Sequence, residues 1–98
     1  MTQGIHYPEI SKEALLHVQF PKGEVLNSAQ EIQNRQTDLA MACRLGNEFK
    51  GKVSIAFMTS EGIREVTTTI WNVGEDVIML KAGAFIPIHT ILSVSYES

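Results

Sequence analysis

The fold is decided by Val66–Leu80, which reads VTTTIWNVGEDVIML. β-Branched and aromatic residues fill both halves of this stretch, and such side chains pack well on a pleated strand. Gly74–Asp76 separates the halves and has the composition of a tight turn. The stretch therefore predicts two antiparallel strands, with Trp71, the only tryptophan, just before the turn.

Alternating apolar residues extend the strand pattern toward the N-terminus. Lys52–Thr59 is predicted to be a strand that turns at Thr59–Gly62 into a long strand over Ile63–Val73. The adjacent residues Ile70 and Trp71 interrupt the alternation, which indicates a bulge or two covered faces near the end of the long strand.

Three further elements follow the turn. Val77–Lys81 is apolar on both faces and is predicted to be a buried strand. Phe85–Ile88 is predicted to be a short strand at an edge or strand end, because Pro87 has no N–H to donate. A corner at His89–Thr90 leads to the last predicted strand, Ile91–Tyr96.

A helix is predicted over Ala29–Leu45. Ser28 and Glu31 have the spacing of a capping box, and Glu31 is also placed to pair with Arg35 one turn later. Gly46 follows the last apolar residue and is expected to end the helix in the left-handed conformation. The apolar stripe is narrow, so the helix is predicted to cover a sheet; the stripe consists of Ile32, Leu39, Ala42 and Cys43.

The N-terminal extension, residues 1–26, fits two interpretations. Ser11 can cap a helix that carries Leu15 and its neighbours, or the alternation over Leu16–Phe20 can form a strand. We favour the strand, because the alternation leads directly into a turn at Pro21–Gly23. The first eight residues are expected to be mobile or docked on a neighbour.

Composition places the chain among ordinary globular proteins. Its 98 residues are enough for one domain, and 44% of them are apolar and 19% charged. The net charge of −3 argues against broad binding to a phosphate backbone, and no apolar run is long enough to span a membrane. The first residues have neither the basic start nor the apolar stretch of a secretory signal, so a cytoplasmic location is expected.

Together these elements predict a single α+β domain, mainly β, over residues 1–98. A helix would pack on a five-stranded, strongly bent antiparallel sheet or partly open barrel. The order of elements from Leu45 to Val94, with Val53-x-Ile55 in the first strand and Ile86-Pro87-Ile88 near the end, resembles the SH3-like and Sm-like barrels. The same span resembles a family of short bacterial proteins whose function is unassigned.

The Sm-like resemblance implies RNA binding through an Asp- or Asn-containing loop and an Arg-Gly pair. Asn72 can be matched to the first, but Ile86–His89 contains no Arg-Gly, so no RNA-binding residues are carried over. Sm proteins also form rings by pairing edge strands, and the resemblance leaves ring formation open.

No pattern of catalytic or metal-binding residues stands out, so we expect no enzyme, no cofactor and no metal. The histidines His6, His17 and His89 are not at metal-ligand spacing. Cys43 lies near the C-terminal end of the helix, which does not stabilise a thiolate, and is predicted to be a buried, inert thiol. The turn carboxylates Glu61, Glu75 and Asp76 are expected to be solvated.

Five residues are candidates for contact with a ligand or partner. Arg44, Lys50 and Lys52 form the tightest basic grouping, at the junction of helix and strand. Trp71 is either a core anchor, the interpretation we favour, or an exposed stacking platform near Phe85 or Tyr96. His89 lies at the corner after Pro87, where hydrogen bonding to a turn is more common than acid–base chemistry; the candidates are thus Arg44, Lys50, Lys52, Trp71 and His89.

These observations predict a non-catalytic binding or regulatory module that self-associates, with a homo-oligomer or a protein as partner and no membrane contact. The alternative is an Sm-like protein that binds RNA or another nucleic acid, for which Arg64 and Lys81 would add to the basic grouping.

Overall fold

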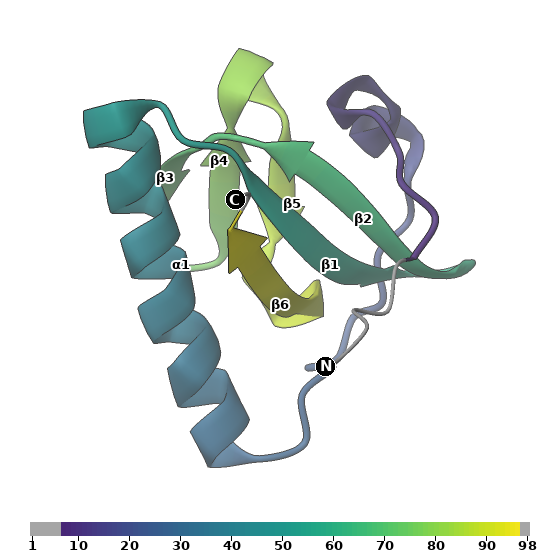
Figure 1. Cartoon of the computed structure of the whole chain (residues 1–98). Helices are drawn as coiled ribbons and strands as arrows, with labels where there is room; N and C mark the ends of the chain where they lie inside the picture. Colours follow the sequence, from purple (N-terminus) through teal and green to yellow (C-terminus); the bar gives the residue numbers. More distant parts are fainter. Residues whose placement is uncertain (1–6, 97–98) are drawn as a thin grey trace, which may run out of the picture.

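Six strands form two antiparallel sheets of three in the computed structural model, which describes residues 7–96 (Figure 1). The strand order is β2-β1-β6 in one sheet and β3-β4-β5 in the other, and neither closes into a barrel. The elements are η1 (Lys12–His17), α1 (Ala29–Phe49), β1 (Val53–Thr59), β2 (Gly62–Thr68), β3 (Ile70–Val73), β4 (Val77–Leu80), η2 (Lys81–Gly83), β5 (Phe85–Pro87), η3 (Ile88–Thr90) and β6 (Ile91–Tyr96).

The α+β class and the long helix are confirmed, but the predicted single sheet of five strands is not what is observed. The long strand predicted over Ile63–Val73 breaks at Thr69, and its halves, β2 and β3, join different sheets. The predicted bulge is present, because the pairing of β3 with β4 shifts between Ile70 and Asn72. Thr69 and Ile70 are both buried, so the alternation of buried and exposed residues does not continue through the break.

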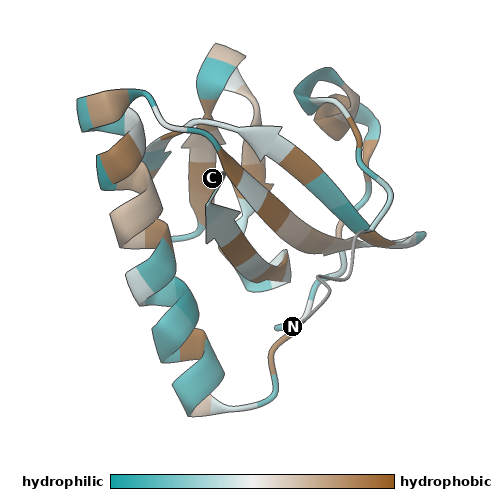
Figure 2. Cartoon of the chain, viewed as in Figure 1, coloured by the Kyte–Doolittle hydropathy of each residue, from teal (hydrophilic) through white to brown (hydrophobic). Residues whose placement is uncertain are grey.

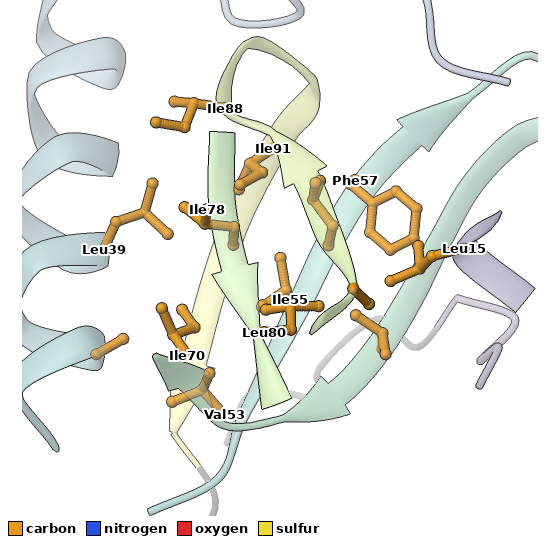
Figure 3. Packing of buried hydrophobic residues seen from close by; sticks show 14 residues of the cluster. Leu15, Leu39, Val53, Ile55, Phe57, Ile70, Ile78, Leu80, Ile88 and Ile91 are labelled. Atoms are coloured by element: carbon orange, nitrogen blue, oxygen red, sulfur yellow. The ribbon is translucent and has the colours of Figure 1, made fainter. Parts of the chain in front are cut away.

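The core lies between the sheets and under α1 (Figure 3). β1 contributes Val53, Ile55 and Phe57, all fully buried, and α1 adds Leu39 and Ala42. The remaining members come from every other strand, from two of the short helices and from the link before β5; they are Leu15, Val66, Ile70, Ile78, Leu80, Ala84, Ile86, Ile88 and Ile91. The first turns of α1 are mostly hydrophilic, as Figure 2 shows, so its packing is concentrated in its second half.

The helix extends beyond its predicted end. α1 continues to Phe49, and Lys50, not Gly46, takes the left-handed conformation, with φ 55°. Gly46 lies inside the helix, where a Cβ atom would come within 2.5 Å of the Ile70 carbonyl oxygen. The glycine therefore serves close packing of α1 on β3 and does not end the helix.

The N-terminal extension contains a short helix instead of the strand that we favoured. Ser11 caps η1, and its Oγ accepts a hydrogen bond from the Ala14 N–H at 3.2 Å. Leu15 is buried while Leu16 is 75% exposed, so the extension buries one side chain of a helical turn and not an alternating strand face. Residues 8–10 lie along β2, because the Pro8 carbonyl accepts the Glu65 N–H; residues 1–6 lie outside the described residues.

No helix within residues 7–96 is long and apolar enough to cross a membrane.

Candidate functional site

Three of the five predicted contact residues share one hollow. Lys50, Lys52 and Trp71 line a cavity of about 300 Å³, together with Lys81. We call this cavity the Trp71 pocket; its remaining lining residues are Gly46, Asn47 and Thr69. The end of α1, the start of β1 and the η2 turn lie at the same end of the molecule in Figure 1.

Backbone contacts bring these elements together. Gly46 lets the last turns of α1 approach β3, and Gly46 and Thr69 both line the pocket. The Lys81 N–H donates to the Thr69 carbonyl at 3.0 Å, which holds the start of η2 beside the bend between β2 and β3. The sequence predicts Lys81 only as an additional basic residue, because its distance along the chain from Lys52 hides their proximity.

Trp71 lies on the surface. Trp71 is 54% exposed while the preceding Ile70 is fully buried, and it lies where the pairing of β3 with β4 shifts register. The favoured interpretation of Trp71 as a core anchor is therefore wrong. Its suggested neighbours are elsewhere, since Phe85 lines a hollow with η1 and Tyr96 lines one with α1.

The Trp71 pocket is basic. Its lining contains three lysines and no carboxylate, histidine or cysteine. Among residues 7–96, none of the three lysine side chains lies in an ion pair. The pocket therefore has the groups to bind an anion.

Arg44 belongs to a different surface. Its Nε lies 3.2 Å from the Glu48 carboxylate one helical turn away, and it lines a hollow with Met41, Phe49 and Tyr96. The predicted basic grouping at the end of α1 is thus divided, with the two lysines on one side and Arg44 on the other.

His89 fastens the N-terminal extension to the sheets. Its Nε2–H donates to the Pro21 carbonyl at 2.6 Å, and its own carbonyl accepts the Val25 N–H at 3.0 Å. Because a carbonyl oxygen only accepts, this contact fixes Nε2 as a protonated ring nitrogen. His89 therefore has a positioning role and does not join the Trp71 pocket.

A buried ion pair lies beside this contact. Arg35 is 5% exposed, and its guanidinium donates to the Glu24 carboxylate at 2.6 and 2.7 Å and to the Ile91 carbonyl at 3.1 Å. Hydrogen bonds from Arg35, with further ones from the Leu26 and Val25 N–H groups, lower the pKa of Glu24 to about 2, against the opposing effect of its burial.

The ion pair predicted between Glu31 and Arg35 does not form. The Glu31 carboxylate accepts instead from the Asn27 N–H, and the Ser28 Oγ accepts from the Glu31 N–H, as the capping box predicts. Arg35 finds its carboxylate eleven residues earlier, at Glu24.

Within the part of the chain that the structure describes, no group of three or more His, Cys, Asp or Glu side chains is arranged to hold a metal ion. Cys43 is half-buried, and the Asn47 amide lies 3.6 Å from its sulfur. His6 lies outside the described residues.

Comparisons with protein-family models, with curated proteins and with solved structures find no match for this chain. Function is therefore inferred from the residues and the geometry above.

Proposed function

We propose that the chain is a small non-catalytic binding module that associates with copies of itself, edge strand to edge strand. The observation that carries the proposal is that β5 and β6 are each an edge strand, one in each sheet. Each of these strands has one partner, β4 for β5 and β1 for β6, so each leaves one edge unpaired within the described chain. Unpaired edges present backbone donors and acceptors that a second chain can satisfy.

An apolar patch lies next to each open edge. Beside β6, the α1–β6 patch contains the exposed side chains of Met41, Phe49 and Tyr96 and the half-buried Leu45. Beside β5, the η1–β5 patch lies around Leu16 and Phe85; its other members are Val18, Phe20 and Ala84. Exposed apolar surface of this kind is typical of protein–protein contacts.

The two edges differ in sequence, which favours a head-to-tail contact. β6 carries Ser93 and Ser95 on its exposed positions, whereas β5 is short and contains Pro87. When β6 of one copy meets β5 of the next, each copy keeps one edge for a further neighbour. Such heterologous contacts give rings when the rotation closes.

The bend from β2 into β3 supports a finer description of the fold as a partly open barrel that resembles the SH3-like and Sm-like barrels. In Sm-like proteins edge strands pair between subunits, and the proposed contact resembles that arrangement. A cytoplasmic location, where the single cysteine would stay reduced, belongs to the same proposal.

Sedimentation velocity over a range of protein concentrations tests self-association. We expect a mass above that of one chain that rises with concentration. Phe85→Lys and Tyr96→Lys each place a charge at one open edge and should lower the mass, whereas Gln33→Lys, on the exposed face of α1, should not. A wild-type protein that stays at the mass of one chain at every concentration contradicts the proposal.

A further inference from the structure

The positive charge of this acidic chain is concentrated at one hollow. The chain has a net charge of −3 and only eight lysines and arginines, yet three of them line the Trp71 pocket. Lys50, Lys52 and Lys81 come from the end of α1, the segment before β1 and the start of η2. Like charges gathered from separate elements repel one another, and a bound anion would relieve that repulsion.

The end of α1 does not cancel this charge. The C-terminus of a helix carries the equivalent of about half a negative charge, against three positive charges on the lysines. The cap also reduces that effect, because the Lys50 N–H donates to the Gly46 carbonyl at 3.0 Å. The pocket is therefore positive at neutral pH.

Trp71 adds an exposed aromatic surface to this basic wall. Trp71 is more than half exposed, although the preceding Ile70 is fully buried. An indole exposed beside lysines combines a stacking surface with cationic groups, which together are the features of sites that bind unpaired nucleotides.

The backbone at the pocket is strained. Within residues 7–96, Lys50 and Ala82 are the non-glycine residues with positive φ, at 55° and 70°. Lys50 is itself a pocket residue, and Ala82 directly follows Lys81. Left-handed backbone at residues other than glycine is unfavourable, and such strain gathers at sites that position a ligand.

We infer that the Trp71 pocket binds a nucleotide unit, with the base stacked on the Trp71 indole and the phosphate held by Lys50, Lys52 and Lys81. Two sources share this chemistry, a free nucleotide and one unit of a single-stranded nucleic acid. An acidic peptide would satisfy the lysines but would leave the indole unused. A duplex hides the base faces in its own stack, so it is a poorer fit. This inference goes beyond self-association and does not depend on it.

Trp71 is the only tryptophan, so its fluorescence reports on the pocket directly. The wild-type protein is titrated at low salt with a single-stranded oligonucleotide of eight thymidines, with adenosine 5′-monophosphate, with inorganic phosphate and with a duplex. We expect the oligonucleotide or the mononucleotide to quench Trp71, and the duplex and inorganic phosphate to bind more weakly. Saturation by the mononucleotide alone identifies a free nucleotide, and tighter binding of the oligonucleotide identifies a single strand.

Substitutions distinguish the contribution of base stacking to the affinity from the contribution of the lysine charges. Trp71→Ala, followed by anisotropy of a labelled oligonucleotide, should weaken binding by about 5- to 150-fold, and Trp71→Phe should restore part of the loss. Lys52→Gln should reduce the slope of log affinity against log salt by about 0.7. Lys22→Gln, which removes the same charge outside the pocket, should leave that slope unchanged.

Lys50→Gly keeps the fold while removing a pocket charge, because glycine adopts positive φ without strain. Its thermal midpoint should be equal to or higher than that of the wild type, while its affinity for the oligonucleotide falls. The inference is overturned if no probe binds at low salt, if Trp71→Ala binds as tightly as wild type, or if a poly-glutamate peptide binds as tightly as the oligonucleotide. Each titration is run at a protein concentration of known oligomeric mass, so failure here and failure of self-association are separate results.

Discussion

Arg35 places a charged guanidinium in the interior, and Glu24 offsets its charge. The carboxylate reaches it with two short hydrogen bonds, and the pKa of Glu24 falls from 4.5 to about 2 as a result. A lowered pKa in the folded state stabilises the fold above pH 4.5, and this contribution is lost as the pH falls toward 2. At this residue scale, a single pair fastens the N-terminal extension to α1.

Glu24→Gln should therefore destabilise the protein at pH 7. The pKa difference corresponds to about 3 kcal/mol for a sheltered group, but the Glu24 side chain is 33% exposed. Solvent screening lowers the expected loss to about 1–2 kcal/mol. Urea unfolding at several pH values should show this difference between wild type and variant above pH 4.5, and it should shrink toward pH 2. A difference that does not change with pH would refute the ion pair; Glu13→Gln, at an exposed position in η1, is the control.

His89→Ala should release the extension locally. Without the ring, the Pro21 carbonyl loses its donor, and the neighbouring bond from the Val25 N–H to the His89 carbonyl is weakened. Loss of one such hydrogen bond costs about 1 kcal/mol, which makes amide exchange about fivefold faster. Hydrogen exchange of the Val25 amide measures this effect, and His17→Ala, at an exposed position, should leave it unchanged. If the Val25 amide exchanges at the same rate in the wild type and in both variants, His89 does not hold the N-terminal extension in place.

At the scale of elements, the contact between α1 and β3 builds the Trp71 pocket. Gly46 sits against the Ile70 carbonyl and the Thr69 side chain, at distances that a Cβ atom could not keep. The helix consequently runs on to Phe49 and carries Lys50 to the pocket wall. The close approach of α1 to β3 and the additional helical turn up to Phe49 therefore belong to the same packing contact.

Gly46→Ala tests this contact. Alanine favours a helix over glycine by about 1 kcal/mol, but the added Cβ would meet the Ile70 oxygen at 2.5 Å. We expect the steric cost to exceed the helical gain, with a net destabilisation of about 1–3 kcal/mol in chemical unfolding. Asn34→Ala, at an exposed position in the same helix, should be neutral or slightly stabilising. A Gly46→Ala protein more stable than wild type would disprove the close packing.

The sequence predicted an element correctly where the residues that cause it are close together in the chain. The capping box at Ser28 and the turn at Gly74–Asp76 depend on neighbouring residues, so they were found from sequence. The end of α1 was predicted wrongly, because Gly46 is needed for close contact with Ile70 of β3, which lies more than twenty positions later in the chain. Arg35 was assigned the wrong partner for the same reason, since spacing rules consider only one turn of helix.

At the scale of the whole molecule, the sequence predicted an α+β chain with a helix on bent strands, but not its division into two sheets. The division falls at Thr69, where the chain leaves one sheet for the other while Thr69 and Ile70 are both buried, and burial depends on tertiary packing. The candidate site was predicted in part. Lys50, Lys52 and Trp71 meet as a group, whereas Arg44 and His89 lie on other surfaces.

The proposed self-association rests on the edge positions of β5 and β6 in their sheets. Phe85→Lys blocks the β5 edge and leaves the β6 edge intact, and Tyr96→Lys does the reverse. In a head-to-tail assembly, a mixture of the two variants still contains one matching pair of edges.

Sedimentation velocity of that equimolar mixture tests the contact most directly. We predict that each variant alone sediments as a single chain, and that the mixture forms dimers and nothing larger. A mixture that contains only single chains, or a single variant that assembles as far as the wild type, would contradict edge-to-edge association of β5 with β6.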